Sequence, residues 1–403
     1  MSDAIPRDMA LAGSRIDWRK HLLQMIDDED INSDFRPIVN KIVSGTSLSL
    51  EDGIYLYNHS DLETIGKLAN LVKKARFDDR AFFNLNVHIN QTNICTLACK
   101  FCAFRRGRNS KDAYALSIDE YLLEVSQYAQ FVDEVHSVGG LHPDWDINHY
   151  ESLFSKAKSS HPNIHYKALT AVEIKHIAGI SGISIEETLE RLQNAGLGSL
   201  PGGGAEILDD NVRKIICNGK ESSEEYLEIH SIAHSLGIPT NCTMLFGTIE
   251  NTKQKITHMI KLRKTQENTG GFQCFVPYPY LPDNSRLTQA KLATGVEILR
   301  TIAVSRLMLD NIPHVKAYRM NLGDFVSELA LQYGADDIDG TVHKESIMHL
   351  AGSDAPLDHD YNNIARIVND AGCRAVKRNS TYTAFEEIIP IKKTHRKKLP
   401  MAQ

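Results

Sequence analysis

The chain has 403 residues, of which 42% are hydrophobic and 24% are charged, and its formal net charge is −6. This composition is typical of a globular protein with one large domain or two ordinary ones. The negative charge argues against broad nucleic-acid binding, and no apolar run approaches the roughly 18 residues that cross a membrane, so we expect neither nucleic acid nor a membrane as a partner.

Residues 1–84 are predicted to form a polar, mostly helical N-terminal region that packs outside the main domain. The run from Leu48 to Gly53 begins one expected helix. The first 20 residues lack the apolar segment of a secretory signal. Seven cysteines, three of them clustered, suit a reducing compartment better than a disulfide scaffold, so we expect a cytoplasmic protein.

Eight short β-rich runs alternate with amphipathic helical stretches from about residue 85. They cover residues 85–89, 134–138, 165–169, 198–200, 240–245, 272–276, 314–318 and 336–341. Capping boxes at Ser117, Ser184 and Ser222 begin helical runs, and Gly196 and Gly237 follow such runs where a left-handed C-cap would lie. This alternation predicts an α/β protein with a TIM-like (β/α)8 barrel over residues 85–345. A partial barrel and an open sheet are the alternatives.

Residues 346–403 form a separate C-terminal segment in this prediction. The segment contains a basic run at residues 392–398. Such a run is typical of a solvated, poorly ordered chain end, and anion or RNA binding is the less favoured interpretation.

Three cysteines, Cys95, Cys99 and Cys102, follow the first expected strand with the spacing C-x3-C-x2-C. Thiolates are soft ligands that select iron–sulfur clusters or zinc, and three of them can hold three corners of a [4Fe–4S] cube. An electron-transfer ferredoxin normally supplies a fourth cysteine nearby, but the next one in the chain is Cys217. Three protein ligands leave one iron open to a substrate. A zinc knuckle and an iron–sulfur electron carrier are the alternatives.

Chemically rich segments follow the first four expected strands. The cysteine loop follows the first strand, Gly139 and Gly140 follow the second, residues 170–173 end the third, and a glycine-rich loop at residues 201–206 follows the fourth. Active sites of barrels lie at the C-terminal ends of the strands. We therefore expect these segments to meet on one rim, where glycine lets the backbone approach a ligand closely.

Three rim residues have both a functional and a plainer interpretation. His142 could bind a carboxylate or shuttle a proton, although histidines are common in turns. Glu173 ends a strand in the same ring and is a second catalytic candidate. Glu206 could accept hydrogen bonds from ribose hydroxyls, or it could stabilise a helix N-terminus.

Two further patterns resemble metal sites only superficially. His230 and His234 are four residues apart, but the general-base Glu of a zinc-protease motif is missing between them, so we predict surface or packing histidines. The acidic run at residues 336–340 lacks the final Glu and the flanking pattern of an EF-hand. We predict a strand-to-loop segment on the same rim.

The cysteine run, with Phe101 before its last cysteine, resembles the signature of the radical S-adenosylmethionine (SAM) superfamily. The resemblance implies a [4Fe–4S] cluster on the three cysteines, whose open iron chelates the amino and carboxylate groups of SAM. It implies that Phe101 lies in the SAM site and that Gly139 and Gly140 meet the methionyl amino group. It also implies that Gly203 gives space for the sugar or the substrate and that Glu206 binds the ribose.

Further stretches are similar to the aminofutalosine synthase family of the futalosine route to menaquinone. They cover residues 137–143, 167–174, 201–207, 242–247, 269–273 and 334–341, within a similarity that runs from about residue 85 to 370. Two related families, the cyclic dehypoxanthinyl futalosine synthases and the synthases of the deazaflavin F0, share the cysteine motif. They differ at residues 170–173.

The resemblance implies radical addition of the adenosyl group of SAM to the enolpyruvyl double bond of 3-[(1-carboxyvinyl)oxy]benzoate. Rearrangement and decarboxylation then yield 6-amino-6-deoxyfutalosine and bicarbonate, and methionine is released. An electron donor such as flavodoxin or ferredoxin is also implied. The alternative, a cyclase-like or F0-synthase-like enzyme, abstracts hydrogen instead.

Two carboxylates on the implied substrate require cationic or polar partners. His142, Arg213 and Arg319 are the candidates in this sequence, with His142, Glu173 and Arg213 as the expected catalytic residues. Residues 276–282, which are rich in proline and tyrosine, and residues 319–321 depart from the family pattern. We expect both segments near the substrate.

Overall fold

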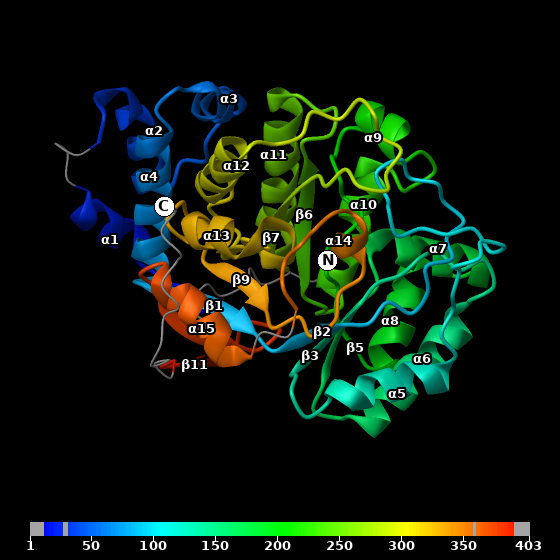
Figure 1. Ribbon diagram of the computed structural model, residues 1–403. Coiled ribbons are helices and arrows are strands. Elements are labelled where there is room, and N and C mark those ends of the chain that lie inside the picture. Colours follow the sequence, from blue (N-terminus) through cyan, green and yellow to red (C-terminus); the bar gives the residue numbers. More distant parts are fainter. Residues whose placement is uncertain (1–11, 27–30, 358–359, 391–403) are drawn as a thin grey trace, which may run out of the picture.

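The first barrel strand is interrupted at Leu85 and therefore consists of two pieces, β1 (Arg80–Asn84) and β2 (Asn86–His88). The computed structural model describes residues 12–26, 31–357 and 360–390, and within these ranges the parallel strands close into a barrel of eight positions (Figure 1). After β2 the strands are β3 (Glu134–Ser137), β4 (His165–Ala168), β5 (Leu197–Ser199), β6 (Thr240–Phe246), β7 (Phe272–Pro279), β8 (His314–Val315) and β9 (Asp337–Gly340).

Hydrogen-bonded pairing runs around the whole ring. β2 pairs with β3, β3 with β4, and β4 with β5, all in parallel. A bridge between Leu200 and Thr240 continues the ring to β6, and β6, β7 and β8 pair in parallel. A bridge between Lys316 and Asp337 leads to β9, which pairs with β1 and closes the barrel. The barrel prediction is confirmed, and the partial barrel and open sheet are excluded.

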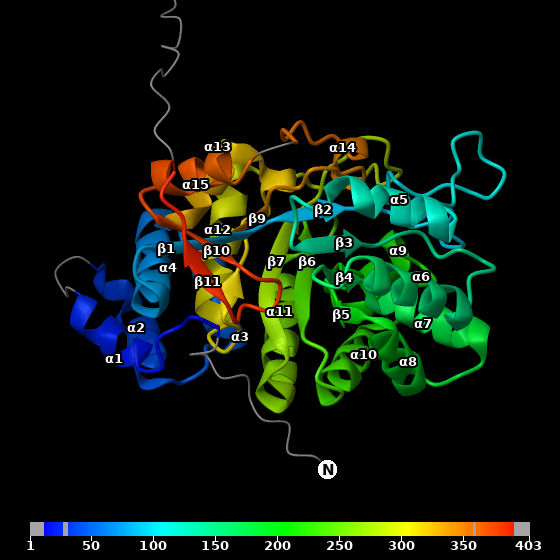
Figure 2. The same cartoon turned by 90° about the horizontal axis from the view of Figure 1, so that it is seen from below.

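Helices alternate with the strands and cover the outside of the barrel (Figures 1 and 2). They are α5 (Ile118–Tyr128), α6 (Ile147–Ser160), α7 (Ala171–Ser181), α8 (Ile185–Ala195), α9 (Asp210–Ile216), α10 (Ser223–Ser235), α11 (Thr252–Thr269), α12 (Gly295–Met308) and α13 (Arg319–Leu331). The capping boxes at Ser117 and Ser222 are reciprocal, whereas Ser184 only accepts a bond from the Glu187 N–H. Gly196 and Gly237 both adopt positive φ after their helices, as expected.

The N-terminal region forms helices that lie on the outside of the barrel (Figure 1). The helices are α1 (Trp18–Met25), a 3-10 turn at Ser33–Phe35, α2 (Arg36–Ser44), α3 (Leu50–Asn58) and α4 (Leu62–Phe77). Helix α4 packs on α1 and α12, and α3 packs on α11 and α12. Ser49 and Asp52 form a capping box at the start of α3, as the sequence predicts.

The C-terminal segment returns to the barrel. After α14 (Ile347–Leu350) and α15 (Tyr361–Asp370), β10 (Arg374–Arg378) pairs in parallel with β1, and β11 (Phe385–Glu387) pairs antiparallel with β10. Figure 2 shows this hairpin crossing the barrel beside β1. The sequence did not predict β10 or β11. The basic run at residues 392–398 lies outside the described residues. The division of the chain into three regions, with boundaries after residues 84 and 345, stays a prediction.

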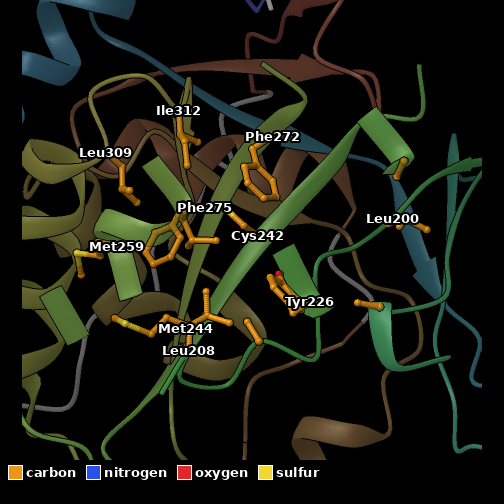
Figure 3. Close-up of a cluster of buried hydrophobic side chains, with 14 of the residues drawn as sticks. Leu200, Leu208, Tyr226, Cys242, Met244, Met259, Phe272, Phe275, Leu309 and Ile312 are labelled. Carbon is orange, nitrogen blue, oxygen red and sulfur yellow. The ribbon is translucent and has the colours of Figure 1, made fainter. Parts of the chain in front are cut away.

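The space between the barrel and its helices is filled with apolar side chains. Figure 3 shows Cys242, Met244 and Phe275 of the adjacent strands β6 and β7 packed against Met259 of α11. All four are fully buried. Strands with both faces buried are typical of parallel sheets, whose covering helices exclude water.

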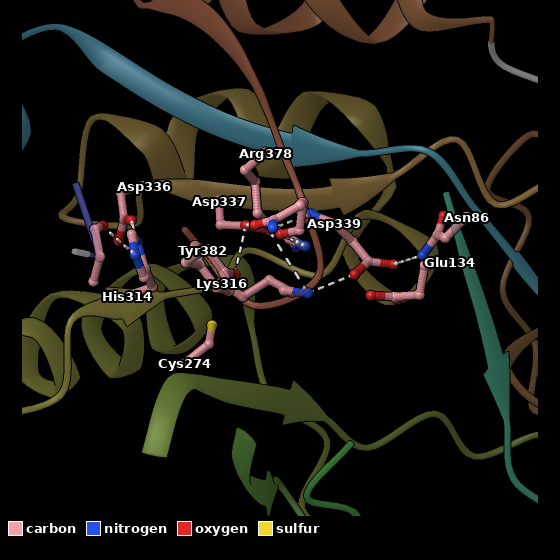
Figure 4. Close-up of polar contacts among 12 residues, drawn as sticks. Asn86, Glu134, Cys274, His314, Lys316, Asp336, Asp337, Asp339, Arg378 and Tyr382 are labelled. Carbon is pink, nitrogen blue, oxygen red and sulfur yellow. Dashed lines mark hydrogen bonds and ion pairs between the residues drawn. The ribbon is translucent and has the colours of Figure 1, made fainter. Parts of the chain in front are cut away.

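The barrel interior also holds a ladder of buried ion pairs (Figure 4). Lys167 of β4 pairs with Glu134 of β3 at 2.6 Å, and Arg378 of β10 donates to Asp337 of β9 at 2.8 Å. The Tyr382 hydroxyl also donates to Asp337, at 2.7 Å. Buried charges require such pairing because they have lost hydration. The C-terminal hairpin therefore supplies a charge on which the barrel interior depends.

Candidate active site

A cavity of about 240 Å3 opens at the C-terminal ends of the barrel strands. Its lining comes from strands β2, β3, β6 and β7 and from the segments that follow β2, β3, β4, β5, β7, β8 and β9. The residues that line it and carry polar groups are His88, Cys102, His136, Thr170, Glu206, Thr243, Tyr278, Tyr280, Tyr318 and Asn321. Phe101 and Gly203 also line it. The segments that the sequence placed on one rim therefore do meet around one space.

The cysteine loop is held in place by its backbone. The Cys95 N–H donates to the Arg106 carbonyl at 3.0 Å, and the Lys100 N–H donates to the Ile216 carbonyl at 2.8 Å. From the other side, the Arg286 N–H donates to the Lys100 carbonyl at 2.7 Å. These bonds close the loop on itself and join it to the end of α9 and to the segment after β7.

The three thiols differ in exposure but belong to one local environment. Cys99 is buried, whereas Cys95 and Cys102 are half-buried. Burial raises the pKa of the Cys99 thiol to about 12 and also raises the pKa of Cys102. Cys217, at the end of α9, is close enough to contribute to the raised pKa of Cys99.

The donor set, three thiols on one loop, fits a cubic cluster. Among the described residues, no three His, Cys, Asp or Glu side chains converge on a point that could hold one metal ion. A cubic cluster needs no such convergence, because each thiolate binds a different iron. Cys102 lines the cavity. A cluster held by Cys95, Cys99 and Cys102 would thus adjoin the space available to substrate.

Gly139 and Gly140 follow β3 and pack directly against the cysteine loop. A Cβ at Gly140 would lie 2.2 Å from the Ile94 carbonyl oxygen, so only glycine fits there. The Gly140 N–H donates to Thr92 at 2.8 Å, and the Gly139 N–H donates to Glu173 at 3.0 Å. Both N–H groups are thus engaged within the protein, so any ligand contact by this pair goes through its carbonyl oxygens.

Glu173 lies beside the cavity without lining it. It is 2% exposed and accepts from Gly139, from the Gln91 side chain at 3.3 Å, and from the N–H and hydroxyl of Thr170, both at 2.7 Å. Burial raises the pKa of Glu173 to about 7, and the hydrogen bonds from Thr170 and Gly139 oppose that shift. The carboxylate therefore joins the start of α7 to the glycine pair.

Glu206 lines the cavity and is paired with a lysine that sequence reasoning missed. Its carboxylate lies 2.6 Å from the Lys220 ammonium, and this ammonium lies 5.6 Å from the centre of the Phe101 ring. Helix α9 begins at Asp210 with Asp209 as its N-cap, so Glu206 is not a helix-terminal residue. Lys220 had no signal in the sequence because it lies in an irregular loop.

Arg213 and His142 lie outside the cavity lining. Arg213 is 4% exposed and donates to the Gly204 carbonyl at 3.1 Å and to the Glu221 carbonyl at 3.0 Å, so it holds the glycine-rich loop from behind. The His142 ring stacks on Trp145 with centroids 4.3 Å apart, and burial lowers its pKa. Arg319 is also buried, where it donates to Asp324 at 3.2 Å.

The structure also places the other histidines and the two segments, residues 276–282 and 319–321, that depart from the family pattern. His230 and His234 both bond to the Thr240 hydroxyl, at 2.9 and 2.8 Å, and are packing histidines as predicted. Tyr278 and Asn321, from the two segments that depart from the family pattern, line the cavity. His88 and His136 were missed, although both occupy inward-facing strand positions two residues after Asn86 and Glu134.

Comparison with known proteins assigns this geometry to a family. The Radical SAM superfamily model matches residues 89–263, and a model described as CofH/MqnC C-terminal region matches residues 269–391. The chain is 40% identical over 351 residues to the aminodeoxyfutalosine synthase of Thermus thermophilus, covering 86% of this chain and 94% of that one. The chain belongs to the radical SAM superfamily. It is therefore an enzyme whose cofactors are a [4Fe–4S] cluster and SAM.

Other relatives carry different activities. The chain is 37% identical to the 5-amino-6-(D-ribitylamino)uracil–L-tyrosine 4-hydroxyphenyl transferase of Methanothermobacter thermautotrophicus, over 85% of this chain and 95% of that one. It is 35% identical to the cyclic dehypoxanthine futalosine synthase of Streptomyces coelicolor, over 87% and 88%. The crystal structure of methylornithine synthase (PylB) superposes with a TM-score of 0.68 at 18% identity, over 83% and 96%, which shows the shared fold.

The structure also bears on the expected partners. In the part of the chain that it describes, no helix is long and apolar enough to cross a bilayer. The 240 Å3 cavity lies just below the range of about 300–1,000 Å3 that is usual for small-molecule sites.

Proposed function

We propose that the protein joins the adenosyl group of SAM to 3-[(1-carboxyvinyl)oxy]benzoate and releases 6-amino-6-deoxyfutalosine, methionine and bicarbonate in menaquinone biosynthesis. The observation that carries the proposal is the 40% identity to an aminodeoxyfutalosine synthase over 94% of its length. The cavity beside the cysteine loop supports it, because both reactants must meet there.

The residues around the cavity have separate tasks in this proposal. Cys95, Cys99 and Cys102 would hold the cluster, which supplies the electron that cleaves SAM reductively. Glu206 would accept hydrogen bonds from the ribose hydroxyls. Lys220 would orient that carboxylate through their 2.6 Å pair.

The cavity also protects a reactive species from water. Phe101, Val138, Leu245 and Leu281 supply apolar surface to its walls. The barrel interior also contains the buried ion pairs Lys167–Glu134 and Arg378–Asp337. Exclusion of water prevents side reactions of a carbon-centred radical.

Two further parts of the proposal are the electron donor and the cellular compartment. Reductive cleavage requires an external one-electron donor, and we propose a flavodoxin or ferredoxin. All seven cysteines lie within the described ranges as free thiols, which supports a reducing compartment, the cytoplasm.

The test is anaerobic reconstitution of the cluster followed by incubation with SAM, reductant and the enolpyruvyl benzoate. Mass spectrometry should find 6-amino-6-deoxyfutalosine formed in step with methionine. Cleavage of SAM without this product, at saturating benzoate, would contradict the proposal.

A hydrogen-abstracting activity is the second candidate, and one observation favours it. Tyr278 and Tyr280, from the proline- and tyrosine-rich segment that we expected near the substrate, line the cavity. A reshaped pocket could admit the substrate of a cyclase-like or transferase-like relative. Such an enzyme would release one 5′-deoxyadenosine for each turnover.

A further inference from the structure

Two histidines stand side by side in the wall of the cavity. His88 ends β2 and His136 lies opposite it on β3, with ring centroids 4.4 Å apart and planes tilted by 33°. Both line the cavity. His88 is 6% exposed, and its ring is also parallel to the ring of Tyr318 at 6.3 Å.

One nitrogen of His88 has no partner. The Nε2 atom is buried without a hydrogen bond and lies 3.9 Å from a carboxylate oxygen of Asp339. Asp339 is held in turn by the Lys316 ammonium at 2.5 Å and by the Asn86 amide at 3.3 Å (Figure 4). Because Nε2 is enclosed against Asp339, a molecule in the cavity can meet the ring only through Nδ1.

The surrounding charges decide the protonation of this pair. Asp339, Glu345 and Glu134 favour a charged His88, and Lys316 opposes it. Around His136, Glu134 and Asp339 favour the charge, and Lys167 and His88 oppose it. Burial outweighs these charges and lowers the pKa of His88 and, further, that of His136. Both rings are therefore neutral near pH 7 when the cavity is empty.

The part of the chain that the structure describes places no permanent cation in the cavity lining for an acidic ligand. Within the described chain, neither lysine nor arginine is among the residues that line it. Among the described residues of the lining, Glu206 is the one that carries a carboxylate, and it pairs with Lys220. A carboxylate that enters must be met by neutral donors or by a histidine that gains a proton.

We propose that His88 and His136 form the carboxylate-binding subsite of the cavity, and that His88 takes up a proton when an aromatic carboxylate binds. As an imidazolium, His88 would donate through Nε2 to Asp339 and through Nδ1 to the ligand, so both ring nitrogens would face a carboxylate. His136 packs against the charged ring and limits its rotation. This inference rests on the proposed function, since it names the group by which that substrate is held.

The test measures binding and proton uptake together by titration calorimetry of the cluster-loaded enzyme without reductant. The ligands are 3-[(1-carboxyvinyl)oxy]benzoate, 3-hydroxybenzoate and 3-hydroxybenzamide, in two buffers of different ionisation enthalpy at pH 7.5. Both carboxylates should bind with uptake of nearly one proton, and the amide should bind without uptake. Because binding takes up a proton, the affinity for the carboxylates should fall about tenfold for each unit by which the pH rises above the pKa of free His88.

Variants distinguish the loss of this subsite from a loss of the folded structure. His88→Gln should bind 3-hydroxybenzoate at least tenfold more weakly and without proton uptake, and His136→Gln should weaken binding while part of the uptake remains. His161→Gln, an outer histidine bonded to Ser126, is the matched control. Cluster content and the thermal unfolding midpoint must match the wild type, and the pH dependence of the wild type tests the proposal without any variant.

The outcomes distinguish the two proposals. Tight binding of the carboxylates without proton uptake, or unchanged uptake in His88→Gln, would overturn the subsite, as would failure of both carboxylates to bind. If His88→Gln also makes product with an unchanged KM, the proposed function stands while the subsite falls. If 3-hydroxybenzoate binds with uptake but the enolpyruvyl ether gives no product, the subsite stands and the proposed function falls.

Discussion

Glu206 and Glu173 are rim carboxylates with different surroundings. Glu206 faces the cavity and has one strong partner, the Lys220 ammonium. Glu173 is not among the lining residues, and its carboxylate accepts hydrogen bonds from Thr170, Gln91 and Gly139. We therefore propose that Glu206 binds the ligand and that Glu173 has a positioning role.

Substitution of Glu206 tests that assignment. Glu206→Gln removes the charge that accepts ribose hydrogen bonds and pairs with Lys220, so SAM binding should weaken by about 1–3 kcal/mol, or roughly 5- to 150-fold. Calorimetry on the cluster-loaded protein measures the change, and Glu224→Gln, an exposed residue of α10, is the control. Unchanged SAM affinity in Glu206→Gln would remove this residue from the site.

The cysteines make a sharper residue-scale prediction. Cys95→Ala, Cys99→Ala and Cys102→Ala should each lose both the cluster and turnover, because three ligands leave no redundancy. Cys217→Ala should retain the cluster, although Cys217 lies close to Cys99. Iron content and the visible absorption spectrum are the readouts. Loss of the cluster in Cys217→Ala would show a fourth protein ligand and contradict an open iron.

At the scale of elements, the C-terminal hairpin is part of the barrel rather than an appendage. Strand β10 extends the sheet beside β1, and its last residue, Arg378, is buried against Asp337. The sequence shows no period-2 alternation strong enough to predict this strand, and local patterns do not identify a partner at the opposite end of the chain. Long-range pairing of this kind becomes visible only in three dimensions.

Two arginines of the same strand provide a matched test of this element. Arg378→Leu should lower the free energy of unfolding by about 3–5 kcal/mol, because Asp337 loses a buried partner. Arg374→Leu breaks an exposed pair with Glu387 and should cost no more than about 1 kcal/mol. Chemical denaturation of both variants measures the difference. Equal effects would mean that the hairpin is not integral to the barrel.

At the scale of the whole molecule, the architecture could be predicted because its signals are local and repeated. Alternating strands and capped helices fix the eight-position barrel, and the rule that barrel sites lie at strand C-termini brings the cysteine and glycine loops together. The polar partners could not be predicted in the same way. Lys220 lies in an irregular loop, and His88 becomes a cavity residue only through the register of β2 and β3. The expected roles of His142 and Arg213 as catalytic residues stay predictions, since neither lines the cavity.

The fate of the adenosyl carbons tests the central claim most directly. The reduced, cluster-loaded enzyme is incubated with ribose-labelled SAM and the enolpyruvyl benzoate, and all labelled products are identified by mass spectrometry. Radical addition predicts that the label enters 6-amino-6-deoxyfutalosine, with free 5′-deoxyadenosine as a minor product. Label found only in 5′-deoxyadenosine would contradict the account and assign the protein to a hydrogen-abstracting branch of the superfamily.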